Sequence, residues 1–266
     1  MRTVRAEIAY DGSRFFGWQR QDGFHSVQAA VENGLAALHD QVVLIHGSGR
    51  TDTGVHALRQ VAHWQTDTRL DDGRLRLALN AHLEDGVVVR RLETCRPDFH
   101  ARFDARAKRY LYVVSTALFR PPFGAQYVHW VPRALDLTNM RAAANVLVGE
   151  HDFAAFGNTP TVRRASTVRN VHGIRWIVRR ERFALVVQGN GFLYNMVRNI
   201  AGTLIDVGIG KLTVDDVRGA LLSGRREETG MCAPAGGLYL LRALYDEPLF
   251  GGRDRGPHGV PGTFQD

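Results

Sequence analysis

Short segments of the chain alternate apolar and polar residues, as β-strands with one buried face do. In residues 3–10, apolar side chains occupy every second position from Val4 onward, and Arg5 and Glu7 stand between them. A continuous apolar run that leads into glycines predicts a buried strand over 42–49. Strands are also expected over 59–66, 86–95, 107–116 and 237–245, and in two runs within 171–191 that are joined by a turn at 179–182.

Apolar residues at every third or fourth position predict helices in other segments. The clearest is 194–207, where one apolar stripe runs along the expected helix. Thr213, followed three residues later by Asp216, forms a pattern typical of a capping box, so a short helix is expected to follow. Ser26 is a suitable N-cap for a helix that reaches Leu38. Residues 73–83 are ambiguous, because Leu75, Leu77 and Leu79 stand at alternate positions, although a short helix suits this segment. A helix is also expected over 136–149.

The order of these elements predicts an α+β fold. Along the chain, β-α-β-β, a helix and a strand are followed by β-α-β-β-α-α-β, which indicates two α+β halves with mainly antiparallel sheets. We expect the halves to span 1–101 and 102–247, with a basic, arginine-lined cleft between them that would suit a nucleic acid. Residues 248–266 are rich in glycine and proline, and we expect them to be disordered.

The charge of the chain points to a polyanionic partner. The formal net charge is +7, and 34 residues are lysine or arginine. Only Lys108 and Lys211 are lysines, so the other basic residues are all arginines. Genomic base composition can raise the arginine content for no physical reason. Arginine is also the side chain that forks onto phosphates and stacks on bases, so we expect a nucleic acid partner.

Other features exclude several classes of protein. The longest apolar runs, such as 110–114 and 183–187, are far too short to span a bilayer. The amino terminus has the pattern of a strand and lacks the apolar centre of a signal peptide. Cys95 and Cys232 lie far apart and form neither a CxxC motif nor a disulfide framework. This use of cysteine fits a reducing compartment, and we expect a cytoplasmic protein.

The segment HGSGRTDTGVHALRQVAHW (46–64) places Asp52 in a loop rich in glycine and threonine. Taken alone, the pattern is typical of a turn in which an aspartate binds its own backbone. Asp-Thr-Gly is also the tripeptide of aspartic proteases, but those enzymes need two such carboxylates and the chain has no second motif. His46 and His56 flank the loop at a spacing that matches no standard metal site.

A fourth interpretation is a single carboxylate that stays charged and acts as a nucleophile or as an electrostatic stabiliser. Arg50 or a more distant arginine would keep Asp52 ionised, and the glycines would let an RNA backbone approach closely. This combination fits chemistry at the glycosidic bond of a flipped nucleotide. The residues alone indicate this class of reaction and no particular member of it.

Seven blocks of the chain carry a resemblance to a known family. They are YDGSRFFGWQRQ (10–21), SVQAAVE (26–32), GRTDTGVHALRQVAHW (49–64), FHARFDARAKRYLYVV (99–114), HDFAAF (151–156), GNGFLYNMVRNIAGTLIDVG (189–208) and APAGGLYLLRALY (233–245). In this order they resemble the tRNA pseudouridine synthase A family. The resemblance implies isomerisation of uridine to pseudouridine at positions 38, 39 and 40 in the anticodon stem-loop of tRNAs. It also implies a homodimer of the pseudouridine synthase fold, with a central antiparallel sheet and neither cofactor nor metal.

The same resemblance suggests roles for individual residues. Asp52 falls on the catalytic aspartate, which would attack C1′ of the ribose or C6 of the base, or assist a glycal route. Tyr110 falls on the tyrosine expected to stack on the target base; a core aromatic of a strand is the alternative. Arg198 matches the arginine that faces the catalytic acid, and a solvated arginine is the alternative.

Further residues have two interpretations each. Arg50 is a candidate for filling the gap left by the flipped base, or it contacts a phosphate. Leu238 or Leu240 would line the uracil pocket or belong to the core. An aromatic loop (Phe16, Trp18, Gln19 and Arg20) faces RNA or packs against the catalytic loop, and three arginines (Arg163, Arg164 and Arg169) contact phosphates or solvent. The alternative function is a catalytically inactive tRNA-binding protein on the same scaffold, against which the intact candidate site argues.

We expect tRNA binding to weaken steeply as the salt concentration rises. Arginines that neutralise phosphates release condensed counterions, so six or more contacts would raise Kd by at least about a thousandfold between about 50 and 200 mM salt. Fluorescence anisotropy with a labelled tRNA transcript at several KCl concentrations measures this slope. A Kd that does not depend on salt would contradict the expected arginine-lined site.

Overall fold

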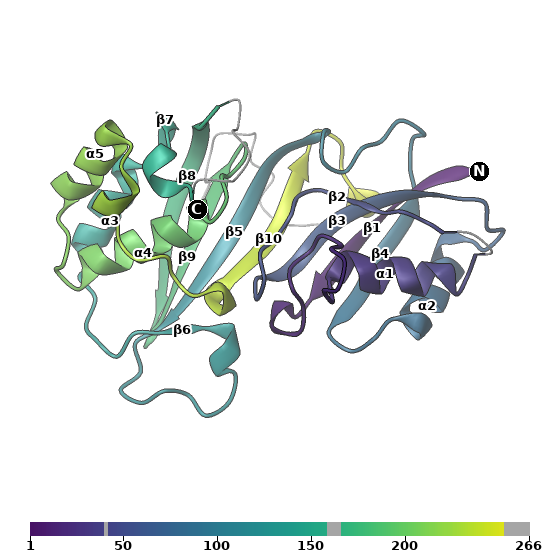
Figure 1. Cartoon of the computed structure of the whole chain (residues 1–266), viewed down its shortest axis with the longest axis horizontal. Helices are drawn as coiled ribbons and strands as arrows, with labels where there is room; N and C mark the ends of the chain where they lie inside the picture. The colour runs from purple at the N-terminus through teal and green to yellow at the C-terminus, as the bar shows by residue number, and fades with distance from the viewer. Residues whose placement is uncertain (40–41, 159–165, 253–266) are drawn as a thin grey trace. The chain divides into compact units, whose positions relative to one another are not determined.

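The computed structural model describes residues 1–39, 42–158 and 166–252 of the chain. These residues form two compact units. The first comprises Met1–Arg106 and the segment that begins at Tyr239, and the second comprises Ala107–Leu238. Each unit combines helices with a mainly antiparallel sheet (Figure 1), so the predicted α+β fold class is confirmed.

The sheet of the first unit has the strand order β4-β1-β3-β10. β1 (Arg2–Tyr10) lies antiparallel between β3 (His56–Thr66) and β4 (Val87–Thr94). β10 (Leu238–Tyr245) pairs in parallel with the start of β3. The short β2 (His46–Gly47) pairs antiparallel with β3, and the chain between these two strands carries the candidate catalytic aspartate.

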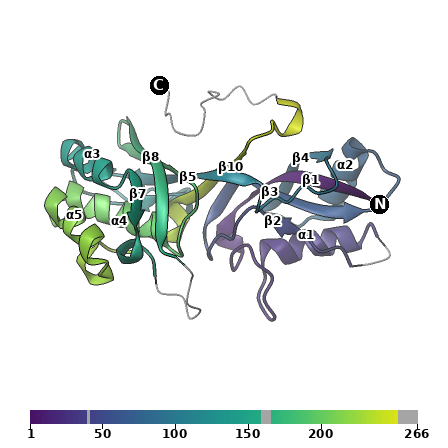
Figure 2. The same cartoon turned by 90° about the horizontal axis from the view of Figure 1, so that it is seen from above.

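Two helices belong to the first unit. α1 (Val27–Ala36) lies along one face of the sheet (Figure 2). The side chain of Ser26 accepts a hydrogen bond from the N–H of Ala29, which confirms the predicted N-cap. α2 (Asp72–His82) contacts α1 and buries Leu75 on its inner face. The predicted helices in both segments are therefore confirmed.

β1 differs from the expected strand with one buried face. Arg5 and Glu7, expected on the polar face, are only 7% and 4% exposed. Arg5 is held by two carboxylates, with Nε 2.6 Å from Glu93 and Nη1 2.5 Å from Glu247. Because buried charges of opposite sign compensate one another, this face can be covered although its residues are charged. An alternating pattern cannot distinguish such a buried ionic face from a solvated one.

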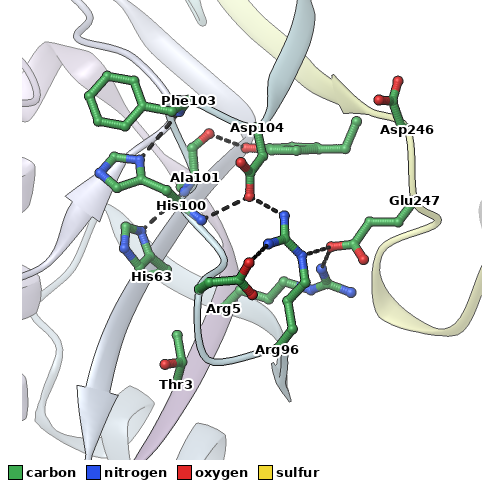
Figure 3. A network of polar contacts seen from close by, with 12 residues as sticks. Thr3, Arg5, His63, Arg96, His100, Ala101, Phe103, Asp104, Asp246 and Glu247 are labelled. Carbon is green, nitrogen blue, oxygen red and sulfur yellow. Dashed lines mark hydrogen bonds and ion pairs between the residues drawn. The ribbon is translucent and has the colours of Figure 1, made fainter.

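Figure 3 shows how ion pairs extend this network into the connection between β4 and β5. Arg96 pairs with Asp104, and the backbone N–H of Ala101 donates to Nδ1 of His63 at 3.2 Å. Burial, with a smaller contribution from the nearby His100, lowers the pKa of His63 to about 4. His63 is therefore a neutral acceptor at physiological pH and holds the connection without adding charge.

The sheet of the second unit has the order β5-β9-β8-β7. β9 (Arg182–Gly189) lies antiparallel between β5 (Ala105–Ser115) and β8 (Val168–Arg179), and β7 (Gly149–Asp152) pairs with β8. β6 (His129–Trp130) pairs in parallel with the end of β5. The predicted pair of strands and its turn are confirmed as β8 and β9.

Three helices pack together in the second unit: α3 (Leu137–Val146), α4 (Met196–Gly208) and α5 (Val214–Ser223). All three were predicted, and the capping box of Thr213 with Asp216 is confirmed at the start of α5. No helix in the described parts of the chain is long and apolar enough to cross a membrane. Short 3-10 helices are η1 (Gly12–Arg14), η2 (Ala125–Tyr127), η3 (Ala154–Phe156), η4 (Arg226–Glu228), η5 (Ala235–Gly237) and η6 (Phe250–Gly252).

The prediction of a buried strand over 42–49 is wrong. Val42 and Leu44 are 80% and 60% exposed, and strand pairing in this segment is confined to β2. The N–H of Ile45 donates to the carboxylate of Glu32 in α1, so a helix side chain replaces the neighbouring strand as its partner. The tail predicted to be disordered lies outside the described residues from 253 onward, and the candidate residues Arg163 and Arg164 also lie outside them.

Two glycines allow a matched test of the packing in the second unit. An added Cβ at Gly202 in α4 would lie 1.8 Å from the carbonyl oxygen of Met231, whereas one at Gly219 in α5 would meet nothing within 4 Å. We expect Gly202→Ala to lower the free energy of unfolding by about 2 kcal/mol, because the backbone must move. Gly219→Ala should raise it by about 0.5–1 kcal/mol. Urea unfolding measures both, and equal shifts would contradict this difference in packing.

Candidate active site

Asp52 lies half-buried in the loop between β2 and β3. The start of the loop is tied to β3, because Ser48 Oγ donates to Gln60 Oε1 at 2.5 Å and Gln60 Nε2 donates to the carbonyl of Gly49 at 2.8 Å. The end of the loop closes in a turn, where the N–H of Val55 donates to the carbonyl of Asp52 at 3.1 Å. Both sides of the aspartate are therefore anchored.

Tyr10, the last residue of β1, reaches the same loop. Its hydroxyl lies 2.8 Å from Oγ1 of Thr51, and both side chains are buried. Burial raises the pKa of Tyr10 well above its ordinary value, and the negative charge of Asp52 acts in the same direction. The phenol therefore stays protonated next to the aspartate and holds the loop by a neutral hydrogen bond.

The segment after β1 packs its backbone directly against the loop. A Cβ at Gly12 would lie 2.1 Å from the carbonyl oxygen of Val55, and one at Gly17 would lie 2.7 Å from that of Thr51. Gly17 also has a φ of +83°, a conformation that favours glycine. The N–H of Trp18 donates to the carbonyl of Thr51 at 3.0 Å. We call these contacts the glycine clamp.

His56 continues the clamp at the start of β3. Its Nδ1 accepts the N–H of Gly12 at 3.0 Å and lies 3.2 Å from a carboxylate oxygen of Asp11. The imidazole is 2% exposed and stacks on Tyr239 of β10, with ring centroids 4.8 Å apart. His56 is therefore a buried positioning residue for the segment that touches the Asp52 loop.

The residues of the aromatic loop differ in exposure, and therefore in which of their two interpretations, contact with RNA or packing against the Asp52 loop, they fit. The Trp18 ring is buried and lies against Gly47, so this residue packs against β2, directly before the loop that carries Asp52. Arg20 pairs with Glu32 at 2.6 Å. Phe16 is 51% exposed, and so it does not share the packing role of Trp18.

The candidate residues fall in both units. Arg50 and Asp52 share one loop in the first unit, and Arg50 is exposed. Tyr110 of β5, in the second unit, is 8% exposed and packs edge-on against Phe192, with ring centroids 5.2 Å apart. Leu238, also assigned to the second unit, is 5% exposed, as a core or pocket-lining residue would be.

Arg198 is the one residue of α4 that is not classed as buried. Its Nε donates to the carbonyl of Ala233 at 2.7 Å, and its Nη1 donates to Asn195 at 2.9 Å. The carbonyl of Arg198 accepts the N–H of Ala233, which links the same two segments again. Tyr112 lies close enough for the charge of Arg198 to lower its pKa, against the larger effect of burial, which raises it. Arg198 is thus a partly exposed side chain that two hydrogen bonds hold in place.

Sequence reasoning missed the residues that position Asp52. The pattern of β1 included Tyr10 only as a strand residue, His56 was considered only as a metal ligand, and Gln60 was not singled out. Their roles depend on contacts between segments far apart in the chain, which periodicity does not report. The described residues also contain no group of three or more His, Cys, Asp or Glu side chains that could hold a metal ion.

Comparisons with known proteins define the class of this site. A family model described as tRNA pseudouridine synthase matches residues 6–104 and 143–246, which include Asp52 and Arg198. The tRNA pseudouridine synthase A of Bacillus pumilus is 42% identical over 247 residues, covering 91% of this chain and 99% of that protein. That of Bacillus licheniformis is 40% identical over 245 residues, with the same coverage of both chains. Among solved structures, a Cbf5-Nop10-Gar1 complex covers 76% of this chain and 45% of its own, with a TM-score of 0.35 and 11% identity.

The matched ranges and the level of identity define a pseudouridine synthase. The chain belongs to the tRNA pseudouridine synthase family. The resemblance drawn from the seven sequence blocks is confirmed, and the aspartic protease interpretation of Asp-Thr-Gly is set aside.

The glycine clamp gives a test of how Asp52 is positioned. We expect Gly17→Ala to lower the rate of the reaction about a hundredfold, because the new Cβ displaces the backbone at Thr51 and Asp52. Gly210→Ala is the control: Gly210 has a similar φ of +77° but meets nothing within 4 Å. Single-turnover assays on a tRNA transcript compare the two. Equal rates for both variants would show that backbone strain alone, and not the contact with the loop, explains the loss.

Proposed function

We propose that this protein isomerises uridine to pseudouridine at positions 38, 39 and 40 of the anticodon stem-loop of tRNA, with Asp52 as the nucleophile. The observation that carries the proposal is the clamped loop around Asp52, in a chain about 40% identical to tRNA pseudouridine synthases A. In this reaction the bond from C1′ to N1 breaks and the bond from C1′ to C5 forms. C5 loses its proton and N1 gains one, so the reaction needs no oxidant, reductant or second substrate.

Asp52 meets the main requirement of the chemistry, a carboxylate held in a fixed place. Its loop is bound by Gln60, Tyr10 and the glycine clamp. The carboxylate attacks C1′ or C6, or assists a glycal route; in each case it must be ionised and must not move with the leaving base. A neutral Tyr10 beside it supplies a hydrogen bond to the loop without neutralising the carboxylate.

The other candidate residues have supporting roles in the proposal. Tyr110 stacks on the target base, and its edge-on contact with Phe192 would fix the ring. The role proposed for Arg198 is the one that the family resemblance gives it, the arginine that faces the catalytic acid; its bonds to Ala233 and Asn195 use two of the five N–H donors of a guanidinium. Two further residues complete the set: Arg50 fills the gap left by the flipped base, and Leu238 lines the uracil pocket.

We also propose that the protein acts in the cytoplasm as a homodimer. The two cysteines are consistent with a reducing compartment, because neither belongs to a disulfide in the described structure. The homodimer rests on the family resemblance. Sedimentation equilibrium of the purified chain tests it directly, and a mass equal to one chain at all concentrations would contradict it.

Replacement of the nucleophile is the decisive experiment for the proposed reaction. The wild-type protein should form pseudouridine at positions 38–40 of an unmodified tRNA transcript, mapped by carbodiimide adducts and primer extension. Asp52→Asn should form none, at a tRNA affinity within about threefold of wild type, because the carboxylate acts in the reaction more than in binding. Asp215→Asn changes an exposed aspartate on α5 and should retain full activity.

Two outcomes of this experiment would overturn the proposal. Binding of tRNA without any product from the wild-type protein would support the catalytically inactive tRNA-binding protein. Product from Asp52→Asn at the wild-type rate would remove Asp52 from the role of nucleophile.

A further inference from the structure

Phe16 and Phe24 form an exposed aromatic pair that the proposed reaction does not use. Each residue is 51% exposed, and the ring centroids lie 5.2 Å apart at an interplanar angle of 58°. Single exposed aromatics are common, but two in contact on one loop expose apolar surface that a partner can cover. We call Phe16 and Phe24 the aromatic pair.

The loop that carries the aromatic pair is held closed by its own hydrogen bonds. The N–H of Phe16 donates to the carbonyl of His25 at 2.8 Å, and the N–H of Phe24 donates to that of Gln21 at 3.2 Å. Phe15 is buried below and contacts the His25 ring, with centroids 4.9 Å apart. The rings are therefore presented on a backbone that is ordered before any partner binds, which lowers the entropic cost of binding.

The aromatic pair is joined to the catalytic loop by a single residue. Gly17 follows Phe16 directly, and a Cβ at Gly17 would lie 2.7 Å from the carbonyl oxygen of Thr51 and 3.2 Å from the carbonyl carbon of Asp52. The loop that carries the aromatic pair therefore packs its backbone against the loop that carries Asp52. Arg14 and Arg50 are both exposed; Arg14 precedes Phe16 by two residues and Arg50 precedes Asp52 by two. Both guanidinium groups can contact phosphates of the tRNA.

We propose that the aromatic pair is a stacking platform for an unpaired base of the tRNA next to the target uridine. The proposal rests on the role of Asp52 as the acid that meets the target. Stacking suits this surface because an aromatic ring can accept the face of any base. One platform could then serve tRNAs with different sequences beside the modified position, as a substrate range of three neighbouring positions requires.

Substitution of the two rings by leucine tests the platform, since leucine keeps the apolar character and removes the aromatic face. Binding is measured by anisotropy with a labelled, unmodified tRNA transcript, in an Asp52→Asn background that prevents turnover. Phe16→Leu and Phe24→Leu should each raise Kd about tenfold. The slope of log Kd against log salt should stay unchanged, because stacking releases no counterions. Phe123→Leu, at a phenylalanine 91% exposed in the second unit, is the matched control and should bind as the background protein does.

Phe16→Trp should bind tRNA at least as tightly as the Asp52→Asn background, because the larger ring stacks as well or better. The proposal is overturned if both leucine variants bind within twofold of the Phe123→Leu control. A smaller salt slope in the leucine variants would also overturn it, since that result identifies a lost phosphate contact. Loss of a dimer in the double leucine variant would identify a contact between protein chains instead. These binding results are independent of product formation, so they separate a failure of the platform from a failure of the proposed reaction.

Discussion

The close approach of two backbone segments, residues 12–18 and 51–55, is the constraint on which the candidate site depends. Gly12 and Gly17 bring one segment so near the other that any side chain at either position would meet a carbonyl oxygen. A catalytic carboxylate must be held within a fraction of an ångström of its reacting position. The loop around Asp52 is rich in residues that favour turns, and it gains a fixed position from this packing more than from its own sequence.

β1 makes two kinds of polar contact in the first unit: buried ion pairs in its middle and a neutral hydrogen bond at its end. Away from the loop, β1 buries charge, with Arg5 enclosed by Glu93 and Glu247. Next to Asp52, β1 ends in Tyr10, whose hydroxyl remains neutral. The phenol holds the loop through a neutral hydrogen bond to Thr51, so β1 adds no buried charge next to the carboxylate.

Much of the fold could be predicted from the spacing of apolar residues, because each helix and each long strand buries an apolar face of its own. The failures share a cause. Residues 42–49 have the composition of a strand, but the backbone of Ile45 bonds to a carboxylate in α1, and β1 has a polar face that ion pairs keep buried. Both features depend on a partner from another part of the chain. The same holds for the site: Asp52 could be identified by motif and resemblance, but Tyr10, Gln60 and His56 become visible only in three dimensions.

One short segment therefore joins two requirements of an enzyme that acts on RNA. Gly12 and Gly17 pack this segment against the Asp52 loop, and Phe16 of the same segment forms an exposed pair with Phe24. A Cβ at Gly17 would lie 3.2 Å from the carbonyl carbon of Asp52, and Phe16 is the direct neighbour of Gly17 in the chain. A base bound there would stiffen the segment that positions the acid, and binding and chemistry would then be coupled through local backbone packing, without any movement of the rest of the fold.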